Sequence, residues 1–174
     1  IEARKIAEEL KRLIEHDPRL TFGVIAFYRA QVTELWQELC KLGLAEITDD
    51  GTFQVAPAWR ETTNHEGKLV ERLRIGTVDA FQGKEFDVVF LSVTRSNNIQ
   101  TSPDTPETYR RKYGFLLLEN RLCVAMSRQQ RLLIAAGDLE MIRVEADKPQ
   151  NEPQAIRELI AFYELCQTSS GKPF

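Results

Sequence analysis

A group of hydrogen-bonding side chains surrounds a single glycine, Gly83, between two β-rich runs of the sequence. Gln82 precedes this glycine, and Lys84 and Glu85 follow it. Glycine allows a backbone to approach a ligand closely or to adopt a positive φ, and exposed backbone N–H groups at such a turn form an anion-binding concavity. The pattern indicates a strand, a ligand-facing loop and a second strand. A glycine that serves only the turn is the simpler alternative.

This loop lies within a longer block, residues 77–97, which reads TVDAFQGKEFDVVFLSVTRSN. The block resembles motif V of the superfamily 1 helicases, in the branch of the RNA helicase of nonsense-mediated decay and the flap-processing DNA helicase/nuclease. The resemblance implies a nucleotide-facing group, formed by Gln82, Gly83, Lys84 and Glu85. It also implies a second group that faces a nucleic-acid strand, formed by Thr77, Asp79, Ser92, Arg95 and Ser96.

A second candidate segment follows the apolar run 22–27, which is typical of a strand buried on both faces. Polar residues come next, and a helix is predicted from there to about Leu42. The carboxyl end of such a strand is the usual ligand position in an open α/β sheet, although Tyr28 alone is more often a half-buried aromatic. The segment resembles motif IV of the same helicases, P-Y-R-x-Q, with Phe27 in place of the proline. The resemblance implies that Tyr28, Arg29 and Gln31 face the nucleotide.

The third segment, residues 120–128, reads NRLCVAMSR. Arg121 and Arg128 are seven residues apart, which would put both on one face of a helix predicted within 115–128. The segment resembles helicase motif VI, R-L-N-V-A-x-S-R-A, with Cys123 and Gln129 as departures. The resemblance implies that Arg128 is the catalytic arginine finger that reaches the γ-phosphate of ATP, and that Arg121 also contacts the nucleotide. A helix-end arginine that satisfies backbone carbonyls is the alternative.

Together the three motifs imply an α/β fold, a RecA-like three-layer sandwich with a mostly parallel sheet. Residues 1–174 would form one such domain, the second motor domain of a DNA or RNA helicase. No phosphate-loop pattern occurs in the sequence. ATP with Mg²⁺ would therefore be shared with an N-terminal RecA-like domain of the same polypeptide, this chain would supply no metal ligands, and the isolated fragment would be inactive. The alternative is a catalytically inactive RecA-like interaction module, which the departures at Phe27, Cys123 and Gln129 favour.

The composition is that of a globular protein, with 43% hydrophobic and 28% charged residues among 174. No apolar run is long enough for a membrane helix. A net charge of −3 argues mildly against a nucleic-acid module, so only a local basic surface could bind a strand of DNA or RNA. Three widely spaced cysteines, Cys40, Cys123 and Cys166, are predicted to be reduced core thiols of a cytoplasmic protein.

Periodicity and turn residues predict the remaining elements. Helices are expected at 2–15, up to 142 and at 156–165. Strands are expected at 73–78, 88–93 and 132–136, the last of them buried. An insertion at 45–70 would comprise a hairpin around Asp50-Gly51 and a loop from 57 to 70, with Trp59 in a packing role. A surface loop at 96–106, a linker at 148–153 and a tail at 169–173 complete the chain.

Residues 109–113 read YRRKY. Cations flanked by tyrosines could bind a nucleic-acid backbone by charge and stacking. A solvated helix start is the simpler interpretation, and the sequence leaves both open.

Overall fold

The computed structural model describes residues 1–102, 104–141 and 153–168. The chain forms two compact units, and each unit combines two segments that are not consecutive in the sequence. Unit 1 comprises Ile1–Thr94 and Val124–Ala136, and unit 2 comprises Arg95–Cys123 and the chain from Gly137 onward. The predicted linker at 148–153, apart from Pro153, and the predicted tail at 169–173 lie outside the described residues.

A four-stranded parallel sheet forms the centre of unit 1. Its order is β6 (Leu73–Thr77), β1 (Phe22–Ala26), β7 (Phe86–Ser92) and β8 (Gln129–Ala136). Phe22 at the start of β1 aligns with Leu73 of β6 and with Val88 of β7. The predicted parallel α/β sheet is thus confirmed, and β7 begins at Phe86 rather than at Val88.

The edge strand β8 is longer and more exposed than the sequence predicts. It begins at Gln129 rather than at Leu132, and among the described residues β7 is its only strand neighbour. Leu132 is 45% exposed, whereas Ile134 is buried. The prediction of a buried strand is therefore wrong, because a continuous apolar run indicates burial on both faces only for a strand inside the sheet.

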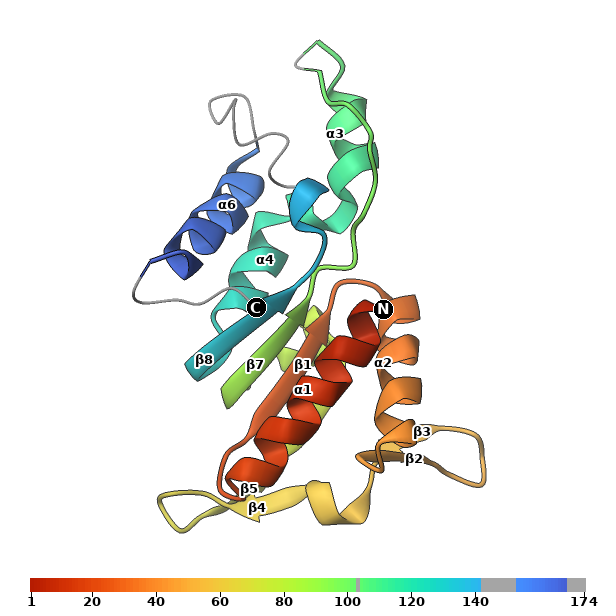
Figure 1. Ribbon diagram of the computed structural model, residues 1–174, viewed down its shortest axis with the longest axis vertical. Helices are drawn as coiled ribbons and strands as arrows, with labels where there is room; N and C mark the ends of the chain where they lie inside the picture. The colour runs from red at the N-terminus through yellow and green to blue at the C-terminus, as the bar shows by residue number, and fades with distance from the viewer. Residues whose placement is uncertain (103, 142–152, 169–174) are drawn as a thin grey trace. The chain divides into compact units, whose positions relative to one another are not determined.

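Two helices, α1 (Glu2–His16) and α2 (Arg29–Lys41), pack against each other and against the sheet. Figure 1 shows α1 lying over β1. The buried side chains of α1 recur at helical spacing, and they share one core with alternate residues of the strands. That core includes Ile6, Leu10, Ile14, Phe22, Val24, Leu35, Leu39 and Phe90. The predicted helix at 2–15 and the helix that ends near Leu42 are confirmed.

Gly23 of β1 and Gly76 of β6 face a one-turn 3₁₀ helix, η2 (Val78–Phe81). A Cβ added to Gly23 would lie 2.8 Å from Cε1 of Phe81, and a Cβ added to Gly76 would lie 2.9 Å from that of Ala80. The ring of Phe81 is fully buried and contacts Phe86 edge-on, at 5.6 Å between centroids. Two glycines thus let the segment after β6 fold back flat against the sheet.

The segment 45–70 contains two hairpins. β2 (Ala45–Ile47) pairs with β3 (Phe53–Val55) around the predicted Asp50-Gly51 turn, which is confirmed. After the short helix η1 (Pro57–Trp59), β4 (Glu61–Thr63) pairs with β5 (Leu69–Glu71). The prediction of a loop from 57 to 70 is therefore wrong.

Asn64 explains the second hairpin. Its side-chain oxygen accepts the backbone N–H groups of Glu66 and Lys68, and Gly67 supplies the positive φ of 77° that the turn needs.

The packing role expected of Trp59 is confirmed. Its indole N–H donates to the carbonyl of Gly43 at 3.1 Å, and the guanidinium of Arg72 lies 4.8 Å from its ring centroid.

Unit 2 contains α3 (Pro106–Tyr113), η3 (Gly114–Leu117) and α6 (Gln154–Cys166), and α4 (Glu119–Met126) crosses the boundary between the units. The helix predicted within 115–128 is confirmed as α4, which the extended Leu118 separates from η3. The helix predicted at 156–165 is confirmed as α6, which packs against η3. The helix predicted up to 142 reaches Met141 in the described residues.

All three cysteines have free thiols. Cys123 is exposed, so its predicted place in the core is wrong, and Cys40 and Cys166 are half-buried. Burial raises the pKa of the Cys40 thiol, and the negative charge of Glu46 raises it further. None of the helices in the described part of the chain is both long and apolar enough to span a membrane.

Candidate nucleotide site and nucleic-acid interface

The predicted nucleotide loop lies at the amino end of β7. Gln82, Gly83, Lys84 and Glu85 are all exposed, and the backbone N–H of Lys84 donates to the carbonyl of Phe81 at 3.0 Å. Gly83 has a φ of 72°, as its residue type allows, and no atom lies within 4 Å of the position its Cβ would take. The loop therefore presents open backbone to solvent.

Arg128 lies beside this loop. Its Nη1 donates to the carbonyl of Lys84 at 3.4 Å, and its own carbonyl accepts the N–H of Phe86 at 2.9 Å. Its Nε donates to the carbonyl of Val124 at 3.0 Å, and its Nη2 donates to Oγ of Ser127 at 2.8 Å. Two sequence segments that are 44 residues apart are thus brought together at the amino edge of the sheet.

The predicted helical pairing of Arg121 with Arg128 is wrong. α4 ends at Met126, and Arg128 belongs to the short connection to β8. Arg121 remains on α4, within unit 2, where its guanidinium lies 5.5 Å from the ring centroid of Phe115. Arg128 nevertheless satisfies a helix-end carbonyl, that of Val124, as the alternative interpretation expects.

Sequence reasoning missed two residues at this edge. Gln130, in β8, donates from Nε2 to Oε2 of Glu85 at 3.2 Å. Asp87 is 7% exposed, and its Oδ2 accepts the backbone N–H of Thr21 at 2.9 Å and the hydroxyl of the same residue at 2.8 Å. Its Oδ1 lies 2.9 Å from Nε of Arg131. Asp87 thus joins β7 to the start of β1 and to β8, and only its place within the motif V block could have drawn attention to it.

A second polar cluster lies at the carboxyl edge. Nε2 of Gln31 donates to Oγ of Ser92 at 2.9 Å, and Ser92 also contacts the carboxylate of Glu2. That carboxylate accepts the N–H of Thr94 at 3.2 Å. Burial raises the pKa of Glu2, and the bonds from Ser92 and Thr94 only partly oppose this effect. Ser92 is fully buried, so its position does not favour the predicted contact with a nucleic-acid strand.

The predicted nucleotide-binding residues fall at opposite edges of the sheet. The loop 82–85 precedes β7, whereas Tyr28, Arg29 and Gln31 follow β1, whose last residue Ala26 aligns with Ser92 at the far end of β7. Six residue steps of β7 separate the two edges, roughly 20 Å. Within unit 1, the two groups therefore lie at opposite edges of the sheet.

The predicted strand-facing residues are also divided. Thr77, the last residue of β6, is half-buried, and Asp79, in η2 directly after this strand, is exposed. Arg95 and Ser96 belong to unit 2. Nη2 of Arg95 donates to the carbonyl of Arg111 at 2.6 Å, and the hydroxyl of Ser96 donates to the carboxylate of Asp138 and holds the pKa of that carboxyl below its usual value.

The sequence profile of a known family, described as an AAA domain, matches residues 1–140. The chain belongs to the AAA domain family. Several similar proteins are helicases by name. DNA polymerase alpha-associated DNA helicase A of Saccharomyces cerevisiae is 32% identical over 126 residues, which cover 72% of this chain and 13% of that protein. Putative helicase mov-10-B.2 of Danio rerio is 30% identical over 148 residues, 80% of this chain and 12% of that protein. Probable RNA helicase armi of Drosophila melanogaster is 28% identical over 123 residues, 68% of this chain and 10% of that protein.

The chain therefore spans about an eighth of the first two relatives and less of the third. The family match and these relatives identify it as a superfamily 1 helicase domain with a RecA-like fold. Within this helicase domain the amino edge combines the exposed loop 82–85 with the guanidinium of Arg128, whose N–H donors are suited to phosphate oxygens. No group of three or more His, Cys, Asp or Glu side chains within the described ranges is arranged to hold a metal ion.

Proposed function

We propose that this domain is the second motor domain of an ATP-dependent helicase that acts on single-stranded DNA or RNA. ATP would lie between the amino edge of the sheet and an N-terminal RecA-like domain of the same polypeptide. The contact between Arg128 and the carbonyl of Lys84 carries the proposal, because it joins the two segments that resemble motifs V and VI at one exposed edge.

At that edge Arg128 acts as the arginine finger. A guanidinium remains charged at all working pH values and offers a planar fork of N–H donors to phosphate oxygens. Hydrogen bonds to Ser127, Val124 and Lys84 hold the guanidinium of Arg128 in place before ATP binds. Closure of the two motor domains would exchange some of these bonds for bonds to the γ-phosphate. Glu85, which Gln130 orients, is the acceptor available to a ribose hydroxyl.

The groups at this edge suit the phosphates of a nucleoside triphosphate, but they do not suit its metal ion. Gly83 presents open backbone and Arg128 a cation, so this chain would contact phosphate oxygens. Mg²⁺ neutralises the charge that develops on the phosphates during transfer. Since the described residues offer no metal-ligand cluster, the ion would be held by the phosphates and by the N-terminal domain.

The carboxyl edge is the better candidate for the nucleic-acid strand. Tyr28 and Arg29 lie there with Thr77 and Asp79, at the end of the sheet opposite to Arg128. We therefore move Tyr28, Arg29 and Gln31 from the predicted nucleotide set to the strand-facing set. An aromatic ring and a cation suit stacking on bases and contact with phosphates.

Hydrolysis in the full-length protein tests this function. Arg128→Ala should leave nucleotide binding nearly unchanged and reduce ATP turnover, stimulated by single-stranded DNA or RNA, by about 10³-fold or more. Arg128→Lys should remain close to Arg128→Ala, because an ammonium cannot reproduce the fork. Arg12→Ala is the matched control, since Arg12 is exposed and pairs with Glu9 on its own helix.

Equal turnover in parent and Arg128→Ala would refute the arginine-finger assignment. If the parent hydrolyses no ATP with either kind of strand, the alternative of an inactive interaction module replaces the motor. Arg128 also donates a hydrogen bond to the backbone carbonyl of Val124, so its loss could destabilise the fold. The melting temperature of each variant therefore separates lost catalysis from lost folding.

A further inference from the structure

The three cations of α3 have different surroundings, although they are consecutive in the sequence. Lys112 is only 2% exposed, and its ammonium lies 5.3 Å from the ring centroid of the buried Tyr113. Arg110 and Arg111 are exposed. The interpretation of a simple solvated helix start is therefore wrong for Lys112, and it leaves two arginines to be explained.

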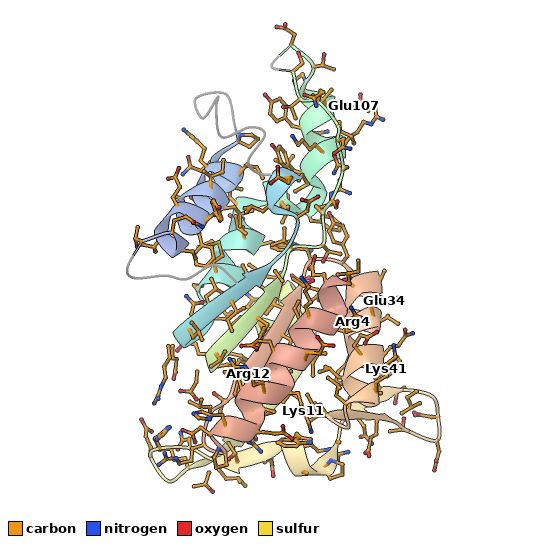
Figure 2. All side chains as sticks on the ribbon, in the orientation of Figure 1. Arg4, Lys11, Arg12, Glu34, Lys41 and Glu107 are labelled. Atoms are coloured by element: carbon orange, nitrogen blue, oxygen red, sulfur yellow. The ribbon has the colours of Figure 1, made fainter. Side chains whose placement is uncertain are left out.

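Arg110 and Arg111 line a cavity of about 410 Å³ together with Pro106 and Glu107, one helical turn earlier. Figure 2 labels Glu107 on α3, within unit 2. Among the residues that the structure describes, no carboxylate lies within 4.0 Å of either guanidinium, so neither arginine is neutralised by an ion pair there. The side chains that line the cavity carry a net positive charge, from two arginines against one glutamate.

Two side chains that follow β7 hold the carboxyl end of α3. Nη2 of Arg95 donates to the carbonyl of Arg111 at 2.6 Å, and Nδ2 of Asn97 donates to the carbonyl of Lys112 at 2.9 Å. The last carbonyls of a helix have no partner within the helix, so these bonds satisfy them. Arg95 and Asn97 thus fix the helix that presents the cavity.

We propose that Arg110 and Arg111 bind the phosphodiester backbone of a single nucleic-acid strand, with Arg95 and Asn97 as positioning residues. This inference rests on the proposed function and adds a site outside the two edges of the sheet. Guanidinium groups match the geometry of phosphate oxygens. Tyr109 is half-buried and packs against Tyr113, with ring centroids 6.5 Å apart, so the cavity offers cations rather than a free stacking platform. Binding there is sequence-independent.

The acidic balance of the chain makes such a local site necessary for strand binding. The formal net charge is −3, which repels a polyanion at long range. Glu107 lies in the same cavity as the two arginines, so its carboxylate weakens the local positive field. Removing that carboxylate should strengthen phosphate binding, an effect opposite in sign to that of removing an arginine.

The test is a salt titration of strand binding in the full-length protein without nucleotide. Fluorescence anisotropy with labelled single-stranded DNA and RNA gives Kd between about 50 and 200 mM salt. For Arg110→Ala/Arg111→Ala, the slope of log K against log salt should become shallower by about 1.4, and binding near 0.15 M salt should weaken about tenfold. Arg110→Lys/Arg111→Lys should keep most of the parental slope, and Glu107→Gln should bind more tightly than the parent.

Arg4→Ala/Lys5→Ala is the matched control, because it removes two exposed cations from adjacent positions of another helix, α1. An unchanged slope in the double alanine variant would overturn this site while the proposed function stands. Equal losses in the alanine and lysine variants would mean that packing rather than charge matters, which also overturns it. No binding of either strand by the parent would overturn both this site and the proposed strand contacts.

Discussion

Asp87 offers the sharpest test of how the amino edge is held together. It lies within the motif V block, two residues after Glu85, yet it faces the protein interior rather than a ligand. Its carboxylate accepts two bonds from Thr21 and one from Arg131. Asp87→Ala removes all three interactions at once, so we expect a loss of stability from a residue that resembles a site residue in the sequence.

The structure sets the size of that loss. A hydrogen bond to a charged group contributes about 1.5–3 kcal/mol, and a buried donor left without a partner keeps its desolvation penalty. The two bonds from Thr21, at 2.8–2.9 Å, therefore contribute about 3–6 kcal/mol. The side chain of Arg131 is 55% exposed, so its ion pair contributes about 1 kcal/mol or less.

Equilibrium unfolding in urea measures both contributions to the free energy of unfolding. We expect Asp87→Ala to lower the free energy of unfolding several times more than Arg131→Ala, which keeps the bonds to Thr21. Hydrogen exchange at the amide of Thr21 gives a local reading, since that amide donates to Asp87. The reasoning fails if the two variants lose the same stability, or if Asp87→Ala loses less than about 1 kcal/mol.

Two further predictions concern the sheet and its carboxyl edge. Gly23→Ala puts a Cβ 2.8 Å from the ring of Phe81 and should lower the free energy of unfolding in urea by about 1–3 kcal/mol. Adding Phe81→Leu should recover part of this loss. A Gly23→Ala protein as stable as the parent would contradict the packing. Burial raises the pKa of Glu2, so the folded protein binds the proton of this carboxyl more tightly than the unfolded chain does. The stability that this group contributes is therefore present at low pH and is lost as the pH rises through the folded pKa. Glu2→Gln should therefore unfold at higher urea than the parent at pH near 7, and the difference should vanish below a pH of about 4.

The sequence could predict the elements whose signals are local. The run 22–27 is continuously apolar, and the Asp50-Gly51 pair lies between alternating residues, so a buried strand and a hairpin follow directly. The second hairpin depends on one side chain, Asn64, that bonds two backbone N–H groups, and such a bond leaves no periodicity in the sequence. The long motif V block indicated the helicase family, but it could not separate residues that face a ligand from residues such as Asp87 that face the core.

The division of the site between two edges was within reach of sequence reasoning. If β1 and β7 are parallel, residues that follow one strand and residues that precede the other must lie at opposite edges. Tyr28 follows β1 and Glu85 precedes β7, so they could not share one small site in this sheet. The meeting of Arg128 with Lys84 was harder to predict, because it requires that β8 begin at Gln129, opposite Phe86, and not at Leu132.

β7 connects the two edges and limits how the proposed motor could work. All seven of its residues are buried, and it pairs with β1 on one side and with β8 on the other. A strand held on both sides cannot slip by one residue without turning its side chains to the opposite faces. Displacement of the loop before β7 therefore carries Ser92 and its partners with it. Any coupling between ATP at the amino edge and a strand at the carboxyl edge should thus arise from movement of unit 1 as one body, not from rearrangement within its sheet.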